Sequence, residues 1–423
     1  MTAFETIALL LTIAAAFAYV NHRWIRQSPA IGLMAMSLAV SLSMIAVDRL
    51  GWLHVTGVAT KILRHVALDD TLLHGMLGVL LFAGALHINL EDLRKQRLAI
   101  VALAIVGTLL STLVVGALAY VLLPGLGLTL GFAHCILFGA LISPTDPIAV
   151  LDVLKRVGVA RSTEIQIAGE SLFNDGVGVV IFLVVLGVLN GGQAITVGQV
   201  VGLFLREAVG GGLFGLLTGY IAYRLVRSID HYQTELLLTL ALVLGGYAAA
   251  ERLHISAPIA AVVAGLVMGN HGRSLGMSDV TRDHLDKFWS LVDEVMNAVL
   301  FVLVGFEILR VTLGVHAILA GIAMIPVVLL ARLFSVSVPL VLLSRAVQMA
   351  PGSVWLLSWG GLRGGISVAL ALSTPSGPAH DLIVAMTYVV VVFSIFVQGL
   401  TLGPLARRLG GGAHVAPPVA TLG

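Results

Sequence analysis

Long apolar runs recur along nearly the whole sequence, separated by short polar or glycine- and proline-containing segments. A membrane-spanning α-helix needs roughly 20 predominantly apolar residues, so the pattern predicts an all-α polytopic membrane protein with about 13 transmembrane helices. The expected ranges are 4–20, 30–47, 68–87, 98–123, 130–151, 165–190, 197–223, 233–252, 256–270, 288–309, 316–343, 353–373 and 382–404. The division between 233–252 and 256–270 is open, since one re-entrant hairpin would use the same residues.

The basic residues indicate the orientation of these helices. Cytoplasmic loops are enriched in Lys and Arg, and 16 of the 24 basic residues fall in alternate loops and the C-terminal tail, against five in the loops of the other side. We therefore expect the N-terminus outside and residues 405–423 as a short cytoplasmic tail. No Lys or Arg precedes Arg23, so the first run lacks the positive segment of a signal peptide and is predicted to be a retained helix.

Composition excludes a soluble enzyme. Only 11% of the residues are charged and 58% are hydrophobic, whereas a soluble domain usually carries about 25% charged residues. The formal net charge of +2 gives no indication of nucleic-acid binding, and the single cysteine, Cys135, cannot form an internal disulfide. Membrane lipid is the partner that this composition indicates.

The expected helices divide into two halves that run in opposite directions. Six helices within about 1–190 and six within 233–404 flank a linker helix at 197–223, and this arrangement predicts inverted repeats, as in many secondary transporters. One helix in each half is interrupted at a corresponding position, by SPTDP at 143–147 and by GGLRGG at 360–365. Irregular backbone survives in a membrane only where it is buried in protein or lines a cavity. The paired breaks therefore predict a midplane binding site, the alternative being two kinked but merely packed helices.

Polar side chains follow one another on the helix expected at 165–190. Ser171 and Asp175 are four residues apart and share one face, while Glu170 and Asn174 share the adjacent face. Gly178 leaves room for another backbone to approach this helix. We expect the interrupted helix of the same half to pack there, which would bring its own polar residues beside Asp175.

Two carboxylates, Asp146 and Asp175, are expected beside the helix breaks. A carboxylate inside the membrane can bind a cation, carry a proton or form a structural ion pair. Burial favours the neutral form of a carboxylate, so protonation and cation binding can compete at Asp175. Hydroxyl, amide and carbonyl oxygens around it, including those of Thr145, would complete a shell for a hard cation. The alternative for each aspartate is a hydrogen-bonded polar group within the protein core.

Three arginines, Arg206, Arg332 and Arg363, also fall inside or at the edge of the expected spans, where a charge costs about 2.5–3.5 kcal/mol and needs a partner. Arg206 is adjacent to Glu207, and we expect these two to form an interfacial pair. Arg332 lies in the middle of a long apolar span, and we expect it to pair with Glu170. Arg363 is the rival partner for Glu170. Alternatively, Arg363 compensates the carbonyl ends of the broken helices in the second half. With Asp146 and Asp175, the residues Glu170, Arg332 and Arg363 are the charges that we expect within the membrane.

Three motifs carry a resemblance to a known family. The strings SPTDP at 143–147, GESLFNDG at 169–176 and GLRGG at 361–365 occur in this order, and together they resemble the cation:proton antiporter 1 family, particularly its prokaryotic NhaP-type sodium/proton antiporters. The resemblance implies a core of helices at 98–190 and 316–404 with two crossed, partly unwound helices. It also implies that the remaining helices form a scaffold and dimerisation domain, and that the protein is a homodimer in a prokaryotic cell membrane.

The resemblance also assigns roles to single residues. It implies that Asp175 binds the ion, supported by Thr145, Asp146, Ser171 and Asn174. It gives the structural ion pair to Glu170 and a mid-span arginine, best matched by Arg332. An Asn-Asp pair, here Asn174 and Asp175, is associated in the family with electroneutral exchange. Some members carry an acidic residue near the end of the third span, where this chain has an uncharged stretch at 82–89.

These observations predict a secondary antiporter and not an enzyme. Na+, and Li+ as well, would exchange for H+ by alternating access, with both ions competing for Asp175 and with no cofactor. Exchange of K+ for H+ at the same residues stays open, because carboxylate and backbone oxygens serve both ions. An intramembrane enzyme is a further alternative, but no His-Glu-x-x-His motif is present. A cation channel is the third, and flux that saturates and depends on pH would argue against it.

Overall fold

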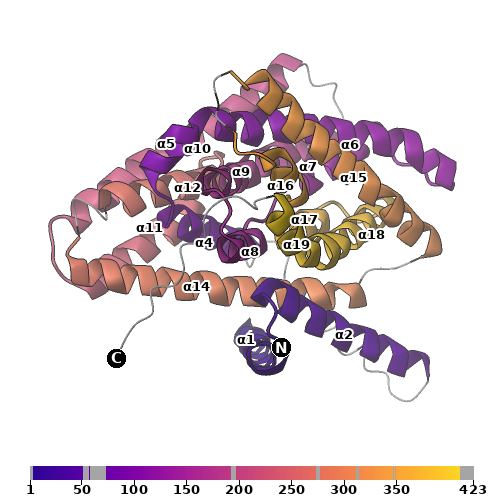
Figure 1. Ribbon diagram of the computed structural model, residues 1–423, viewed down its shortest axis with the longest axis horizontal. Coiled ribbons are helices and arrows are strands. Elements are labelled where there is room, and N and C mark those ends of the chain that lie inside the picture. The colour runs from indigo at the N-terminus through magenta and orange to yellow at the C-terminus, as the bar shows by residue number, and fades with distance from the viewer. Residues whose placement is uncertain are drawn as a thin grey trace.

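A computed structural model describes residues 3–50, 57, 73–191, 197–272, 277–310, 314–345, 347 and 349–409. These residues form an all-α structure, and the described part of the chain contains no strand (Figure 1). The expected all-α fold class is therefore confirmed. The tail beyond residue 409 and the start of the range 68–87 lie outside the described residues.

The helices follow the apolar runs closely. The first half contains α1 (Ala3–Val20), α2 (Pro29–Arg49), α4 (Leu73–Leu86), α5 (Leu90–Val101), α6 (Thr108–Leu122), α7 (Phe132–Ile142), α8 (Ile148–Val157) and α9 (Arg161–Gly191). Next come α10 (Val197–Val226), α11 (Tyr232–Arg252) and α12 (Ala257–Val267). The remainder forms α14 (Asp279–Phe306), α15 (Val315–Leu342), α16 (Ser353–Trp359), α17 (Gly365–Leu372), α18 (Pro378–Phe393) and α19 (Gly399–Leu409). Each expected range that the structure describes is mainly helical, and 130–151 and 353–373 are each divided into two helices at 143–147 and 360–364.

Local chemistry explains several helix ends. The Asn89 side chain accepts hydrogen bonds from the backbone N–H groups of Glu91 and Asp92, which caps the start of α5. A π-helical turn at Ala102–Gly107 then joins α5 to α6 without a loop. Ser278 caps α14 in the same way as Asn89 caps α5, so this helix begins earlier than the expected residue 288. Polar residues occupy its first turns, and apolar length alone could not reveal them.

Length and composition identify fewer membrane crossings among the described residues than the 13 expected. Among the described residues, eight helices are long and apolar enough to cross a membrane. The segments Gly75–Leu86, Phe132–Ile142 and Ala257–Gly272 are apolar but shorter. An interrupted helix does not reach the length required for a crossing in one piece, so a criterion of length and apolarity does not include it. The count of 13 stays a prediction.

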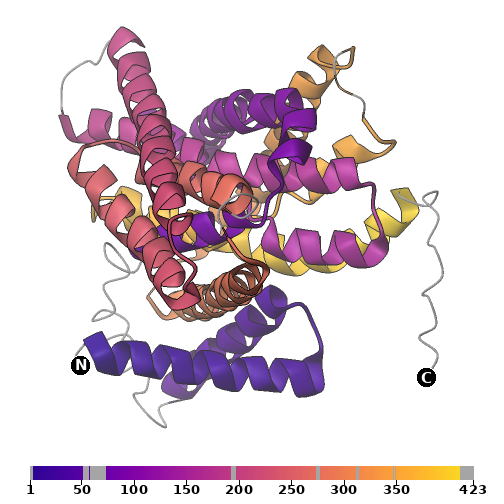
Figure 2. The ribbon, with the colours of Figure 1, turned by 90° about the vertical axis from the view of Figure 1, so that its left-hand side faces the viewer.

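Helix α14 lies between two buried hydrophobic clusters. Its Val302 belongs to the cluster formed with α6, α7, α9, α15 and α18, whereas its Trp289 belongs to the cluster formed with α4, α10, α11 and α12. Helices α1 and α2 pack along the outer side of α14 as a separate layer (Figure 2). Large apolar side chains on α10 remain exposed, including Leu213 and Leu217. Such a surface suits contact with lipid and not with water.

Candidate functional site

The two helix breaks meet inside the molecule. The segment 143–147 separates α7 from α8, and the segment 360–364 separates α16 from α17. The backbone N–H of Asp146 donates a hydrogen bond of 2.8 Å to the carbonyl oxygen of Leu362. Pro144 and Pro147 have no N–H to donate, so ordinary helical bonding cannot continue through the first break. The breaks are therefore crossed and bonded directly to each other.

Arg363 compensates the backbone of the first break. Its guanidinium donates to the carbonyl oxygen of Ser143 and, at 2.9 Å, to that of Pro144. The side chain is only 1% exposed, and its backbone N–H donates to the Ser394 hydroxyl at 2.9 Å. Two alternatives for Arg363 are a pair with Glu170 and compensation of carbonyl ends in the second half. Arg332 bonds the Glu170 carboxylate instead. Arg363 does compensate carbonyl ends, but they belong to the first half, because the crossing places the end of α7 beside it.

Glu170 and Arg332 form a buried ion pair with two hydrogen bonds. The Nη1 group of Arg332 donates to Oε1 of Glu170, and Nη2 donates to Oε2 at 2.9 Å. Nη2 also donates to the carbonyl oxygen of Leu357 at 3.0 Å. Both side chains are buried. Arg332 of α15 thus connects α9 and α16 through hydrogen bonds. Gly361 leaves room for its guanidinium.

Thr145 is held against α9 by a small hydrogen-bond network. Its backbone N–H donates to Oδ1 of Asn174 at 3.3 Å, and Nδ2 of Asn174 donates to the Thr145 hydroxyl at 2.9 Å. The hydroxyls of Thr145 and Ser171 lie 3.0 Å apart and share a further hydrogen bond. Asn174 therefore uses both ends of its amide to position Thr145. All three residues are buried.

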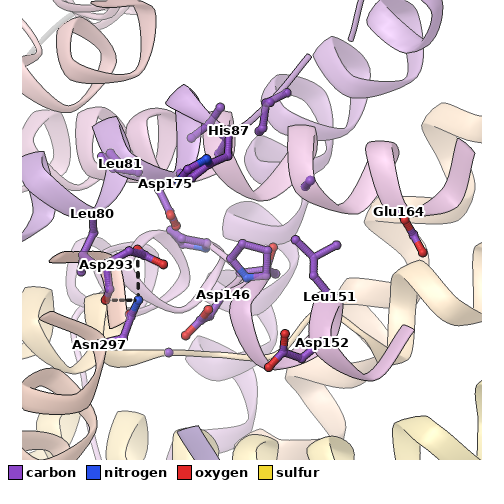
Figure 3. Close-up of a pocket in the computed structure, with 18 of the residues that line it drawn as sticks. Leu80, Leu81, His87, Asp146, Leu151, Asp152, Glu164, Asp175, Asp293 and Asn297 are labelled. Carbon is purple, nitrogen blue, oxygen red and sulfur yellow. Dashed lines mark hydrogen bonds between the residues drawn. The ribbon is translucent and has the colours of Figure 1, made fainter. Parts of the chain in front are cut away.

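A cavity of about 340 Å³ leads to this network and is lined by Asp146 and Asp175 (Figure 3). Asp175 is buried, whereas Asp146 is half-buried. Glycine permits the close approach on both sides of the break. A side chain at Gly178 would enter the Pro144 ring, and one at Gly364 would meet the Asp146 carboxylate. The backbone that approaches Gly178 is thus the first break, as expected.

The opposite wall of the cavity contains two residues that sequence reasoning missed, Asp293 and Asn297 of α14. Figure 3 shows them side by side, with Asp146 and Asp175 also facing the cavity. Asp293 lies within the expected span 288–309, so our expected set of charges within the membrane was incomplete. A carboxylate four residues before an amide, within the apolar part of this helix, was the available signal.

Helices broken in mid-span, crossed and compensated by buried charge define this molecule as a polytopic membrane transporter. Comparison with known proteins identifies the family. Residues 9–408 match the family model described as sodium/hydrogen exchanger, transmembrane. The chain therefore belongs to the sodium/hydrogen exchanger family, as a prokaryotic NhaP-type member of the cation:proton antiporters. This family consists of transporters, so the expectation that the chain is not an enzyme is confirmed.

Individual relatives agree with this assignment over nearly the full length. The chain is 48% identical over 412 residues to the Na+/H+ antiporter NhaP of Pseudomonas aeruginosa, covering 96% of this chain and 97% of that protein. It is 34% identical to the Na+/H+ antiporter NhaH of Halobacillus dabanensis, covering 96% and 98%. The solved structure of the sodium proton antiporter MjNhaP1 from Methanocaldococcus jannaschii matches with a TM-score of 0.76 at 20% identity, covering 97% of this chain and all of that one. This last likeness shows that the fold is shared.

Proposed function

We propose that the protein exchanges Na+, and Li+ as well, for H+ across the membrane, with both ions competing for Asp175. The observation that carries the proposal is the placement of Asp175. This buried carboxylate lies at a cavity beside a broken helix, next to the bonded hydroxyls of Thr145 and Ser171. Oxygen atoms of this kind are the ligands that hard cations prefer. The names of the relatives as Na+/H+ antiporters support the same choice of ions.

In the proposed site, Na+ contacts Asp175, Ser171 and Thr145, with Asp146 close by. Asn174 contributes by holding Thr145 through two hydrogen bonds. Its amide carries no charge and releases no proton, so within the Asn174–Asp175 pair only Asp175 alternates between H+ and Na+. One proton then exchanges for one Na+, and the cycle is electroneutral.

We propose alternating access by movement of a core, helices 98–190 and 316–404, against the remaining helices, which would also form a homodimer interface. The cavity is lined by Lys155 and Arg161 as well as by Asp146 and Asp175. Lys155 lies in the last turn of α8 and Arg161 begins α9, and the predicted topology assigns the connection between these helices to the cytoplasm by its basic residues. The described conformation is accordingly assigned to the inward-facing state, with both halves of the inverted repeat contributing to the core.

Exchange in proteoliposomes tests the function. An imposed Na+ gradient should drive proton movement in the wild type, and Asp175→Asn should abolish it because the amide holds neither ion as a carboxylate does. The matched control is Asp283→Asn on α14, whose carboxylate is exposed and bonded to Lys287. Clamping the membrane potential should leave the wild-type rate unchanged. Full exchange by Asp175→Asn would refute the proposal, and faster exchange in a K+ gradient would make the protein a K+/H+ antiporter.

A further inference from the structure

The wall of the cavity that faces Asp146 carries a buried oxygen atom with no hydrogen-bond donor. Asn297 of α14 is 6% exposed. Its Nδ2 group donates to the backbone carbonyl of Asp293 at 2.9 Å and to the Asp293 carboxylate at 3.2 Å. Its Oδ1 atom is buried and accepts no hydrogen bond from the residues that the structure describes. The amide nitrogen is thus fixed on its own helix, and the amide oxygen is left for a ligand.

An unmatched buried oxygen of this kind costs free energy unless a donor or a cation reaches it. Asn297 and Asp293 both line the cavity that contains Asp175. Figure 3 shows the two α14 side chains bonded to each other on one side of the space, with Asp146 on the other. An amide oxygen beside a carboxylate is a pair of ligands suited to a hard cation.

The arrangement of negative charges gives a second reason to place a cation here. Asp146, Asp175 and Asp293 line the same cavity, so their charges repel one another when they are ionised. No described arginine or lysine forms an ion pair with Asp293, and its hydrogen-bond donor is the neutral Asn297. A cation between these walls reduces the repulsion that ionised carboxylates would otherwise suffer.

We infer that Asp293 and Asn297 form an α14 subsite, which binds the transported cation on the scaffold wall of the cavity before the cation reaches Asp175. The inference rests on the proposed exchange function and adds a ligand pair outside the three sequence motifs. Helix α14 packs against α1 and α2, which lie outside the proposed moving core. The α14 subsite therefore binds the cation only while the cavity is open toward α14. Its effect on Na+ half-saturation depends on the side of the membrane from which Na+ is presented.

The test measures Na+-dependent proton movement in vesicles of known orientation, with Na+ presented on either side. Asp293→Asn should raise the Na+ concentration for half-maximal exchange about tenfold (~1.4 kcal/mol) from the cavity side, and change the maximal rate less than about twofold. From the opposite side, half-saturation should stay near the wild-type value. Asn297→Leu, which keeps the branched shape of the side chain but removes the free oxygen together with the donor to Asp293, should shift half-saturation in the same direction. Melting curves of the purified variants report whether either substitution disturbs folding.

The control is Asp283→Asn, which removes an exposed carboxylate of α14 that is bonded to Lys287 and does not line the cavity. It should leave half-saturation unchanged. An active wild type with unaltered half-saturation in both Asp293→Asn and Asn297→Leu would overturn the α14 subsite alone. An equal shift from both sides, or a loss of maximal rate at constant half-saturation, would also overturn it. A wild type that exchanges no Na+ for H+ would instead refute the proposed function.

Discussion

Removing the Glu170 carboxylate should destabilise the fold far more than it weakens cation binding. Glu170 accepts two hydrogen bonds from Arg332, and both residues are buried. Truncating one partner of a buried ion pair leaves the other charge without compensation, at a cost of about 3–5 kcal/mol. Arg332 would retain only the Leu357 carbonyl among the groups it bonds in the described structure. We therefore expect Glu170→Ala to lose about this much free energy of unfolding and to express poorly.

A double substitution distinguishes the free-energy cost of an unpaired buried charge from the cost of the lost hydrogen bonds. Replacing an entire buried pair by apolar residues of similar volume is often neutral or stabilising. In Glu170→Met/Arg332→Met, the lost donor to Leu357 costs about 1–3 kcal/mol. The double variant should thus be more stable than either single variant, although each single variant carries fewer changes.

Unfolding of the purified protein in mixed detergent micelles provides the free energies, and vesicle assays of the same samples provide Na+ half-saturation. Half-saturation should stay within about threefold of the wild type, since an effect of this size corresponds to less than 1 kcal/mol. Glu91→Ala, which removes an exposed carboxylate from α5, is the control. Wild-type stability in Glu170→Ala together with a more than tenfold loss of Na+ affinity would place Glu170 in the ion site and refute the reasoning.

Two further predictions concern the packing of the first break and the competition between ions. Gly178→Ala should cost about 1–3 kcal/mol of stability and slow exchange, because the added methyl group enters the Pro144 ring. Gly187→Ala should lower neither stability nor rate, since nothing lies within 4 Å of the added atom and alanine favours a helix more than glycine does. Equal melting temperatures and rates for the two variants would contradict this reasoning. If one proton competes with Na+ at Asp175, Na+ half-saturation should fall about tenfold for each unit rise in pH while protonation limits binding, with an unchanged maximal rate. A half-saturation independent of pH throughout would exclude such competition.

Sequence reasoning located the helices and their breaks because both depend on local chemistry. Apolar length determines where a helix can cross lipid, and the prolines of 143–147 and the glycines of 360–365 interrupt helical bonding wherever they occur. The sequence also limited the partners of Arg332, since few acidic residues lie within apolar spans. The roles of Asp175 and its neighbours as ion ligands remain predictions, although the structure brings several of these residues into one hydrogen-bond network.

Other features depend on the angle at which helices cross, which periodicity does not encode. Arg363 bonds the carbonyls of Ser143 and Pro144, more than 200 residues away in the chain, and only the crossing brings them together. Asp293 was missed for a similar reason. A carboxylate on α14 can face lipid headgroups, another helix or the cavity, and the tilt of the helix decides between them. Asn297 has its free oxygen only because its nitrogen bonds back to Asp293.

The contact of Arg363 with the first break means that the two halves of the molecule are not equivalent copies. The half that contains Thr145 and Asp146 presents the proposed cation ligands, while the half that contains Arg363 supplies a fixed positive charge to the exposed peptide carbonyls beside them. Neither half is self-sufficient, since the first break would lack its donors if the second were absent. A chain cut between the repeats would have to reassemble both fragments before any ion site existed, so cation binding by co-expressed halves would report on correct docking of the repeats.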